Sequence, residues 1–301
     1  MKSFDLIRHF DYSVLLPSIA RLPVKMAYRM ADSRGDLVYR YAADSRIHAE
    51  RNVTRVFPQF TAAEAGKVVR NHYRILSRND MEAFWYLRPP SFFETITEVN
   101  GLEELSRAKE AGSGVLLFSG HLGNTGLFFV ALGKKGIEMN IVGRSIDPAE
   151  NPLHPAVRRY AEKRVQRIES TVRRPFLLTG RGNYPRIGEK LRQGEIVMLL
   201  IDVVPYLLKR TVPVSFLGGK ARFGFGIASL YLETGAPVFQ WTIQSGSRNR
   251  IEIRNVTDQL RNMRSNEEIM QRLATLLEEK ICLRPDHWNQ WDSLEHFHAG
   301  T

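Results

Sequence analysis

From about residue 92 onward, short β-rich runs alternate with helical segments, and this alternation constrains the fold more than any other feature of the sequence. The runs 115–118 and 196–201 are apolar throughout, as is typical of strands covered on both faces. Strands that alternate with helices predict an α/β fold, with a mixed, mainly parallel central sheet and helices on both faces. The predicted strands are 93–99, 115–118, 139–142, 196–201, 212–216, 237–243 and 250–256, and the predicted helices are 102–109, 122–132, 155–168, 187–192, 226–233 and 266–281.

The first 90 residues lack this alternation and are predicted to form a helical cover. Residues 37–56 place apolar positions on one helical face, and Thr61-Ala-Ala-Glu64 is a capping box that begins another helix. The apolar stretch 14–24 indicates an interfacial or a core helix, although Pro17 and Pro23 weaken either assignment. Because no linker or repeat interrupts the chain, we expect one domain over 1–301, with a helical section at 1–90 and an α/β core at 91–301.

The chain carries a large excess of positive charge. Lys and Arg number 43 against 32 Asp and Glu, which gives a formal net charge of +11. This excess predicts an anionic partner, namely nucleic acid, an acidic membrane surface or an acidic carrier protein, or else a merely solvated arginine face. The single cysteine, Cys282, excludes an intramolecular disulfide framework and favours a reducing compartment. No apolar run is long enough to span a bilayer and no signal-peptide pattern is present, so we expect a cytoplasmic protein.

The segment from Gly114 to Gly126 carries the strongest chemical signal. An apolar strand runs directly into Ser-Gly-His, and a helix follows, which places His121 at the strand end where α/β proteins usually bind ligands. Gly120 and Gly123 allow close backbone approach, and free N–H groups there would hold an oxyanion. The positive helix end would keep His121 neutral and able to accept a proton. A histidine that caps a turn is the alternative, which the Gly-His-x-Gly-Asn setting disfavours.

The motif Ser-Gly-His-Leu-Gly-Asn resembles the signature of the lysophospholipid acyltransferase superfamily, in particular its bacterial lipid A lauroyl/myristoyl acyltransferase branch. The resemblance extends in the same order over most of the chain. Its further matches are 51–53 with Phe57-Pro58, Val142-Gly-Arg144 with Asn151-Pro152, 193–202, 214–218, 226–237, and Arg284-Pro-Asp-His-Trp288 followed by Trp291.

The resemblance implies an enzyme that transfers an acyl group from acyl carrier protein or coenzyme A thioester to a hydroxyl or amine acceptor, such as a lipid, a glycolipid or a metabolite. It further implies that His121 is the general base, that Arg144 helps to hold the oxyanion, and that the acyl thioester is a co-substrate with no other cofactor. No covalent intermediate is required, in keeping with the lack of a serine-nucleophile elbow. A peripheral position on the inner face of a bacterial cytoplasmic membrane would suit such an acceptor.

One position departs from the resembled pattern. The His-x4-Glu acid of the family falls on Gly126 in this chain. A carboxylate behind a catalytic histidine fixes its tautomer, so another acid must supply this role, or the acceptor must be more nucleophilic, or activity is lost. Asp147, Glu150 and Asp202 are the candidate replacements, and Asp202 ends the most apolar strand, where it is either a helix cap or an orienting residue. The missing acid also leaves open a non-catalytic relative that binds lipid or acyl carrier protein.

The remaining candidates are binding residues. Asn124 is expected to shape the turn or to touch substrate. Arg158 and Arg159 lie on a basic helix after Pro155, which would receive a carrier protein, coenzyme A phosphates or a lipid headgroup, or is only a solvated face. Nucleic acid is not expected, because no basic motif is interleaved with aromatic residues, and no metal site is expected. Acceptor identity, acyl chain length and oligomeric state are not encoded in any pattern of the sequence.

Overall fold

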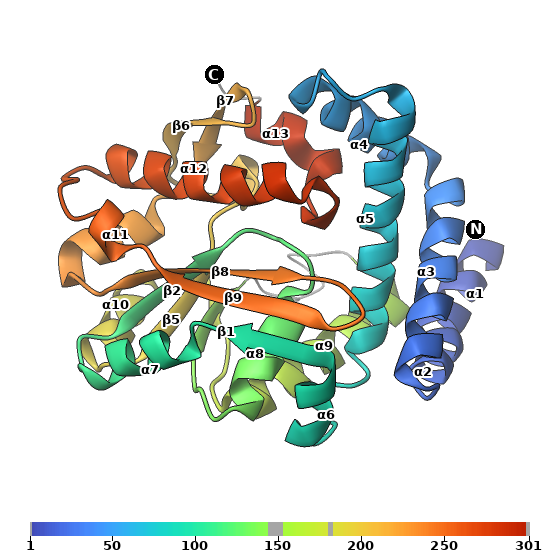
Figure 1. The fold of residues 1–301 in the computed structure, drawn as a ribbon, viewed down its shortest axis with the longest axis horizontal. Coiled ribbons are helices and arrows are strands. Elements are labelled where there is room, and N and C mark those ends of the chain that lie inside the picture. The colour runs from blue at the N-terminus through green and yellow to red at the C-terminus, as the bar shows by residue number, and fades with distance from the viewer. Residues whose placement is uncertain (1, 144–152, 180–182, 299–301) are drawn as a thin grey trace.

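The computed structural model describes residues 2–143, 153–179 and 183–298, and it confirms the α/β class and the helical N-terminal section (Figure 1). Within the described residues, no helix is both long enough and apolar enough to cross a bilayer. The N-terminal helices are Lys2–Phe10 (α1), the π-helical turn Asp11–Leu15 (η1), Leu16–Ile19 (α2), Val24–Tyr41 (α3), Ala43–Val56 (α4), Ala62–Glu82 (α5) and Pro90–Ile96 (α6).

The described strands form a seven-stranded sheet in the order β1-β9-β8-β2-β5-β3-β4, and a separate hairpin of β6 and β7. The central neighbours β8, β2, β5 and β3 run parallel, whereas β9 is antiparallel to β8. The strands are Thr97–Asn100 (β1), Val115–Ser119 (β2), Asn140–Gly143 (β3), Leu177–Leu178 (β4), Ile196–Leu200 (β5), Val212–Phe216 (β6), Gly219–Phe223 (β7), Val238–Gln244 (β8) and Asn249–Asn255 (β9).

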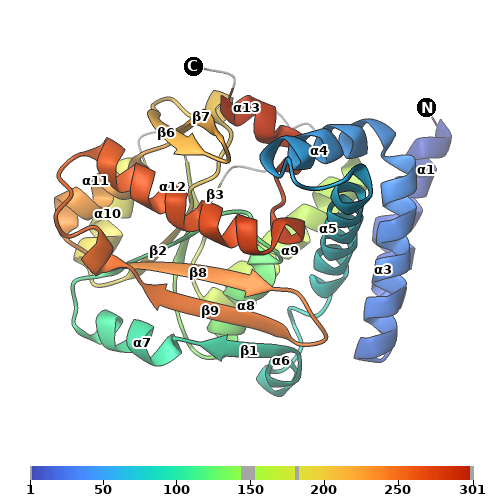
Figure 2. The same cartoon turned by 45° about the horizontal axis from the view of Figure 1, so that its top comes forward.

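Helices cover both faces of the sheet, as Figures 1 and 2 show. Alternate side chains of β2 enter two different cores, with Leu116 and Phe118 in one and Val115 and Leu117 in the other. This double burial is the reason why the strand is apolar at every position. The remaining helices are Leu102–Glu110 (α7), Thr125–Lys134 (α8), Pro155–Val172 (α9), Tyr184–Arg192 (α10), Gly226–Thr234 (α11), Asn266–Leu283 (α12) and Leu294–His298 (α13), with 3-10 turns at Pro205–Leu207, Thr257–Gln259, Pro285–His287 and Trp291–Ser293.

Three predicted elements differ clearly from the structure. The run 93–99 begins as a helix, because Pro90 starts α6 and only Thr97 onward is extended. The predicted helix 37–56 is broken at Ala42 into α3 and α4. The predicted helix 122–132 starts instead at Thr125, since Leu122 pairs with Trp288 and Gly123 adopts a positive φ of 55°.

Candidate active site

His121 and Asp202 meet at the carboxyl edge of the sheet. The two strands that carry them, β2 and β5, are parallel neighbours in which Ser119 lies opposite Leu200, so the residues that follow emerge at the same edge. The Nδ1 atom of His121 lies 2.8 Å from Oδ1 of Asp202. The backbone N–H of His121 also donates to this carboxylate, at 2.8 Å from Oδ2 and 3.0 Å from Oδ1. Asp202 is therefore joined to both the ring and the main chain of His121.

This pairing fixes the tautomer of the histidine. An ionised carboxylate only accepts hydrogen bonds, so Nδ1 of His121 carries the hydrogen and Nε2 has a free lone pair. The Asp202 side chain is fully buried, whereas 32% of the His121 side chain is exposed. Because the bond to Asp202 uses Nδ1, Nε2 is the ring nitrogen left to accept a proton from a ligand.

The environment also sets the proton affinity of His121. Burial lowers the pKa of His121, but the charge and hydrogen bonds of Asp202 act in the other direction and leave this pKa above its usual value. From the positive helix end alone, a lowered pKa of His121 was expected. The carboxylate has the larger effect because it is buried and in direct contact with the ring.

Trp288, whose role sequence analysis did not assign, completes the polar contacts of the dyad. Its indole Nε1–H donates to Oδ2 of Asp202 at 2.8 Å, and the tryptophan is fully buried. The chain around Trp288 also holds the histidine loop: Asn289 N–H donates to His121 O, and Gly123 N–H donates to His287 O, both at 2.8 Å. The resemblance of 284–291 to the closing motif of the acyltransferase family was the signal that could have identified this residue.

Trp288→Phe keeps most of the ring packing but removes the donor to Asp202. We expect a loss of about 1.5–3 kcal/mol of folding free energy, the usual contribution of a hydrogen bond to a charged group. We also expect roughly a tenfold lower kcat for a reaction in which His121 accepts a proton, equivalent to about 1.4 kcal/mol of transition-state free energy. Trp291→Phe is the matched control, because it removes an indole donor to Pro285 O in the same segment without touching Asp202. Equal kcat losses in the two variants would contradict a role through Asp202.

The two glycines beside His121 are required by the geometry of the loop. A Cβ on Gly120 would lie 2.8 Å from Oδ2 of Asp202 and 2.7 Å from Leu277. A Cβ on Gly123 would lie 2.6 Å from Ile243 O, and the positive φ there also favours glycine. The expectation that N–H groups at Gly120 and Gly123 hold an oxyanion fails for Gly123, whose N–H donates to His287 O; the neighbouring N–H of His121 is likewise taken, by Asp202. Contact of these glycines with substrate stays a prediction.

Asn124 fixes the start of the helix that follows. It is fully buried, and its Oδ1 caps α8 by accepting from Leu127 N. The same Oδ1 accepts from the Tyr86 hydroxyl at 3.1 Å and from Arg164 at 3.3 Å, while Nδ2 donates to Glu82 at 2.6 Å. These four contacts use the polar atoms of the side chain to position the turn, and a direct contact of Asn124 with substrate stays a prediction.

The space beside position 126, where the resemblance placed an acid, is filled by Tyr86 and Arg164. A Cβ on Gly126 would clash with the Tyr86 hydroxyl and lie 2.9 Å from Nη2 of Arg164. None of the three atoms nearest to this Cβ position belongs to His121. A carboxylate at this position would therefore meet Tyr86 and Arg164 first, and the acid that contacts His121 in this fold is Asp202, two residues after the end of β5.

Gly126→Glu tests this geometry. We expect a destabilisation of about 2 kcal/mol, because the side chain overpacks a filled site, and no gain in acyl transfer. Gly226→Glu is the matched control, since Gly226 also begins a helix but has no atom near its Cβ position. A rise in kcat for Gly126→Glu would show that the acid at 126 acts on His121 after all. Thermal unfolding and the rate of thiol release give the two readouts.

The other predicted residues are not gathered at the dyad. Arg144, Asp147 and Glu150 lie outside the described residues. Arg158 donates to Leu153 O at 3.1 Å, and Arg159 is exposed beside His9. Within the described part of the chain, neither arginine hydrogen-bonds to the dyad, so their roles in binding substrate stay predictions.

The fold and the site together define a class: an α/β protein that presents a histidine–carboxylate pair, suited to proton abstraction, at the carboxyl edge of a covered sheet. The comparison with protein families is more specific. The model of the bacterial lipid A biosynthesis acyltransferase family matches residues 6–291, and the chain belongs to this family. It is thus a member of a family of acyltransferases in lipid biosynthesis. No curated protein gave a significant match to the chain.

Proposed function

We propose that this protein transfers an acyl group from acyl carrier protein or coenzyme A thioester to a hydroxyl or amine on a lipid acceptor, with His121 as the general base and Asp202 as its orienting acid. The observation that carries the proposal is the 2.8 Å contact between Nδ1 of His121 and the buried Asp202 carboxylate. Membership of the acyltransferase family supports the reaction class.

The reaction needs one proton acceptor and one polarised carbonyl. Nε2 of His121 takes the proton of the acceptor O–H or N–H as that atom forms a bond to the thioester carbon. The imidazolium that results is stabilised by Asp202. When the tetrahedral intermediate collapses, the C–S bond breaks and the proton passes from His121 to the departing sulfur. The products are the acylated acceptor and the free carrier thiol, and the histidine returns to its starting state.

The oxyanion of the intermediate needs donors other than those the loop already uses. Helix geometry leaves the first N–H groups of α8, at Thr125 and Gly126, without an acceptor inside the helix. We propose that these groups, together with Arg144, stabilise the developing negative charge. The positive end of α8 supports this assignment.

The alternative is a non-catalytic relative that binds lipid or acyl carrier protein. Its support was the missing acid at Gly126. The Asp202 contact weakens that argument, because a carboxylate occupies the position behind His121 that an active enzyme requires. An inactive binding protein has no need for a one-third-exposed histidine with this hydrogen bond.

The proposed function is tested with purified protein, a bacterial lipid extract and an acyl thioester of either carrier. Mass spectrometry is expected to show lipid species heavier by one acyl group, with one free thiol released for each transfer. Running acyl carrier protein and coenzyme A donors separately identifies the donor. Thiol release without any acylated lipid would indicate a thioesterase, and the absence of both products would favour the binding protein.

A further inference from the structure

The N-terminal helices expose an unusual amount of apolar surface. Most of the exposed large apolar side chains in the described residues lie within 6–47, far from the dyad in sequence. Three of them are on α1, where Leu6 is 74%, Ile7 65% and Phe10 54% exposed. Clustered exposed apolar residues mark interaction sites, whereas single ones do not.

The outward face of α3 exposes a second group of apolar side chains. Its exposed residues Met26, Met30 and Leu37 fall within about 40° of one another at roughly 100° per residue. The opposite face of α3 packs on α5 so closely that a Cβ on Gly35 would lie 2.6 Å from the main chain of Arg74. Since α5 takes the inner face, the apolar stripe of α3 stays about half exposed among the residues that the structure describes. Figures 1 and 2 both place α1 and α3 at the same edge of the molecule.

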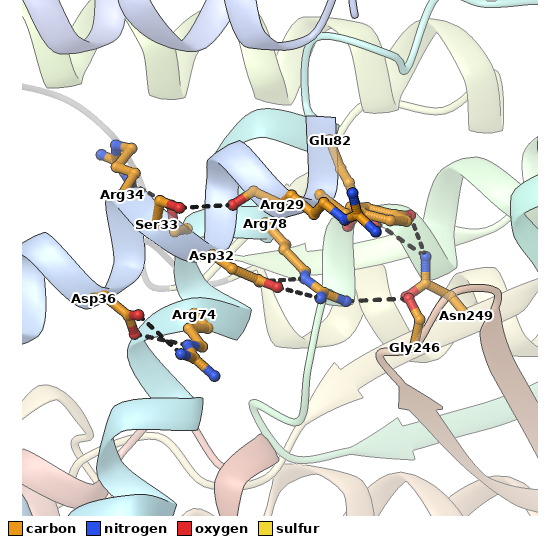
Figure 3. A network of polar contacts seen from close by, with 12 residues as sticks. Arg29, Asp32, Ser33, Arg34, Asp36, Arg74, Arg78, Glu82, Gly246 and Asn249 are labelled. Carbon is orange, nitrogen blue, oxygen red and sulfur yellow. Dashed lines mark hydrogen bonds and ion pairs between the residues drawn. The ribbon is translucent and has the colours of Figure 1, made fainter. Parts of the chain in front are cut away.

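The acidic residues of α3 are turned toward α5 and are paired there. Asp32 accepts from Arg78 at 2.6 Å, and Asp36 accepts from Arg74 at 2.7 Å, as Figure 3 shows. Asp36 also pairs with Arg70 at 2.6 Å, and these arginines hold the pKa of its carboxyl well below the usual value. The ion pairs remove the negative charges of the helix from its outward face.

The cations of α3 are distributed in the opposite way. Lys25, Arg29 and Arg40 are exposed, and none has a carboxylate partner in the part of the chain that the structure describes. The outward face therefore combines an apolar stripe with positive charge that no acid of the same helix offsets. This combination is the pattern of a helix that lies in a membrane interface, with cations at the headgroups and apolar side chains below them.

We propose that the outward faces of α1 and α3 form a docking surface for an anionic lipid bilayer, with Leu6, Ile7, Phe10, Met26, Met30 and Leu37 entering the interface and Lys25, Arg29 and Arg40 contacting lipid phosphates. The charge complementarity selects an anionic bilayer over a neutral one. The surface is separate from the dyad and rests on no step of the proposed reaction, so it is tested without acyl donor.

The test measures binding of the full chain to sedimented vesicles of phosphatidylglycerol with phosphatidylcholine, and of phosphatidylcholine alone. We expect binding to the anionic vesicles that weakens as salt is raised. The pair Arg29→Glu and Arg40→Glu is expected to weaken it at least roughly 25-fold, from about fivefold for each cation near the surface. The pair Ile7→Ser and Leu37→Ser is expected to weaken it at least about tenfold. Leu232→Ser on α11 is the matched control and should bind as the parent does, because Leu232 is similarly exposed on another part of the molecule.

Several outcomes would overturn the proposal. One is that the parent protein does not bind anionic vesicles. Another is that the surface variants bind these vesicles as tightly as the parent does and have the same thermal stability. Self-association in sedimentation that the same variants abolish would assign the surface to a second copy of the chain. If the surface variants lose binding to an acidic carrier protein but still bind vesicles, the surface is assigned to that carrier protein. His121→Ala should bind vesicles normally, which separates this result from any failure of the proposed reaction.

Discussion

His121→Ala is expected to lower kcat for acyl transfer by about 10²–10⁴-fold, the usual contribution of a positioned general base. Nε2 of the ring is the proton acceptor of the pair, since Nδ1 is bonded to Asp202, and 32% of the side chain is exposed. The substitution removes this acceptor but keeps the backbone N–H that binds Asp202. The loop should therefore remain folded, and binding of the thioester should change little.

The measurement for His121→Ala is the initial rate of thiol release in parallel with acylated lipid. His48→Ala is a suitable control, because His48 is exposed on α4 and its ring contacts Arg51 rather than Asp202. Thermal unfolding checks that His121→Ala is folded. Transfer at the parental rate by a folded His121→Ala protein would exclude His121 as the base.

Asp202→Asn is expected to lower kcat by about 10³–10⁴-fold, through the tautomer of His121 more than through any change in packing. The Asp202 carboxylate accepts three donors: the backbone N–H of His121, the Nδ1–H of its ring, and the indole of Trp288. An amide has only one acceptor oxygen. If that oxygen serves the two donors at Oδ2, the amide NH₂ faces Nδ1 and forces the hydrogen onto Nε2. The base is then lost, as in the Asp→Asn variant of a serine protease triad, where the rate falls about 10⁴-fold.

The pH profile separates this role of Asp202 from a merely structural one. His121 must be neutral to act as a base, so kcat/KM of the parent should rise with pH through the pKa of His121, which Asp202 raises above the ordinary value of about 6.5. Without the negative charge, burial alone acts and lowers this pKa. The rising limb of Asp202→Asn should thus move to lower pH while the plateau falls. A lower plateau with an unmoved limb would show that Asp202 acts only on the fold.

Much of the fold could be predicted because periodicity is a local property. The apolar run 115–118 has to be buried on both faces, and the capping box at Thr61 forms in the structure as predicted, with the Thr61 and Glu64 side chains each bonded to the other's backbone. One boundary failed because a distant segment decided it. Leu122 has ordinary helix propensity, yet pairing with Trp288 keeps it extended, and no neighbour in sequence records that contact.

The basic helix after Pro155 shows the same limit. Its sequence predicts a helix with one positively charged face. In the structure Arg164 donates to Asn124, and Arg167 donates to Ala83 O at 2.7 Å, so both are turned toward the protein. Helical spacing gives the direction of a side chain relative to its own helix, but the helices packed around it decide which direction is the interior.

The sequence by itself determined the α/β class, the placement of His121 at the end of a strand, and the presence of glycine at position 126, where the resemblance predicts an acid. It left three carboxylates as candidates to replace that acid. Only the tertiary structure brought Asp202, 81 residues away, against the His121 ring and added Trp288 behind it. The physical reason is strand order. Two apolar strands that look alike in sequence become parallel neighbours only when the whole sheet assembles, and their register then places the two side chains within one hydrogen bond of each other.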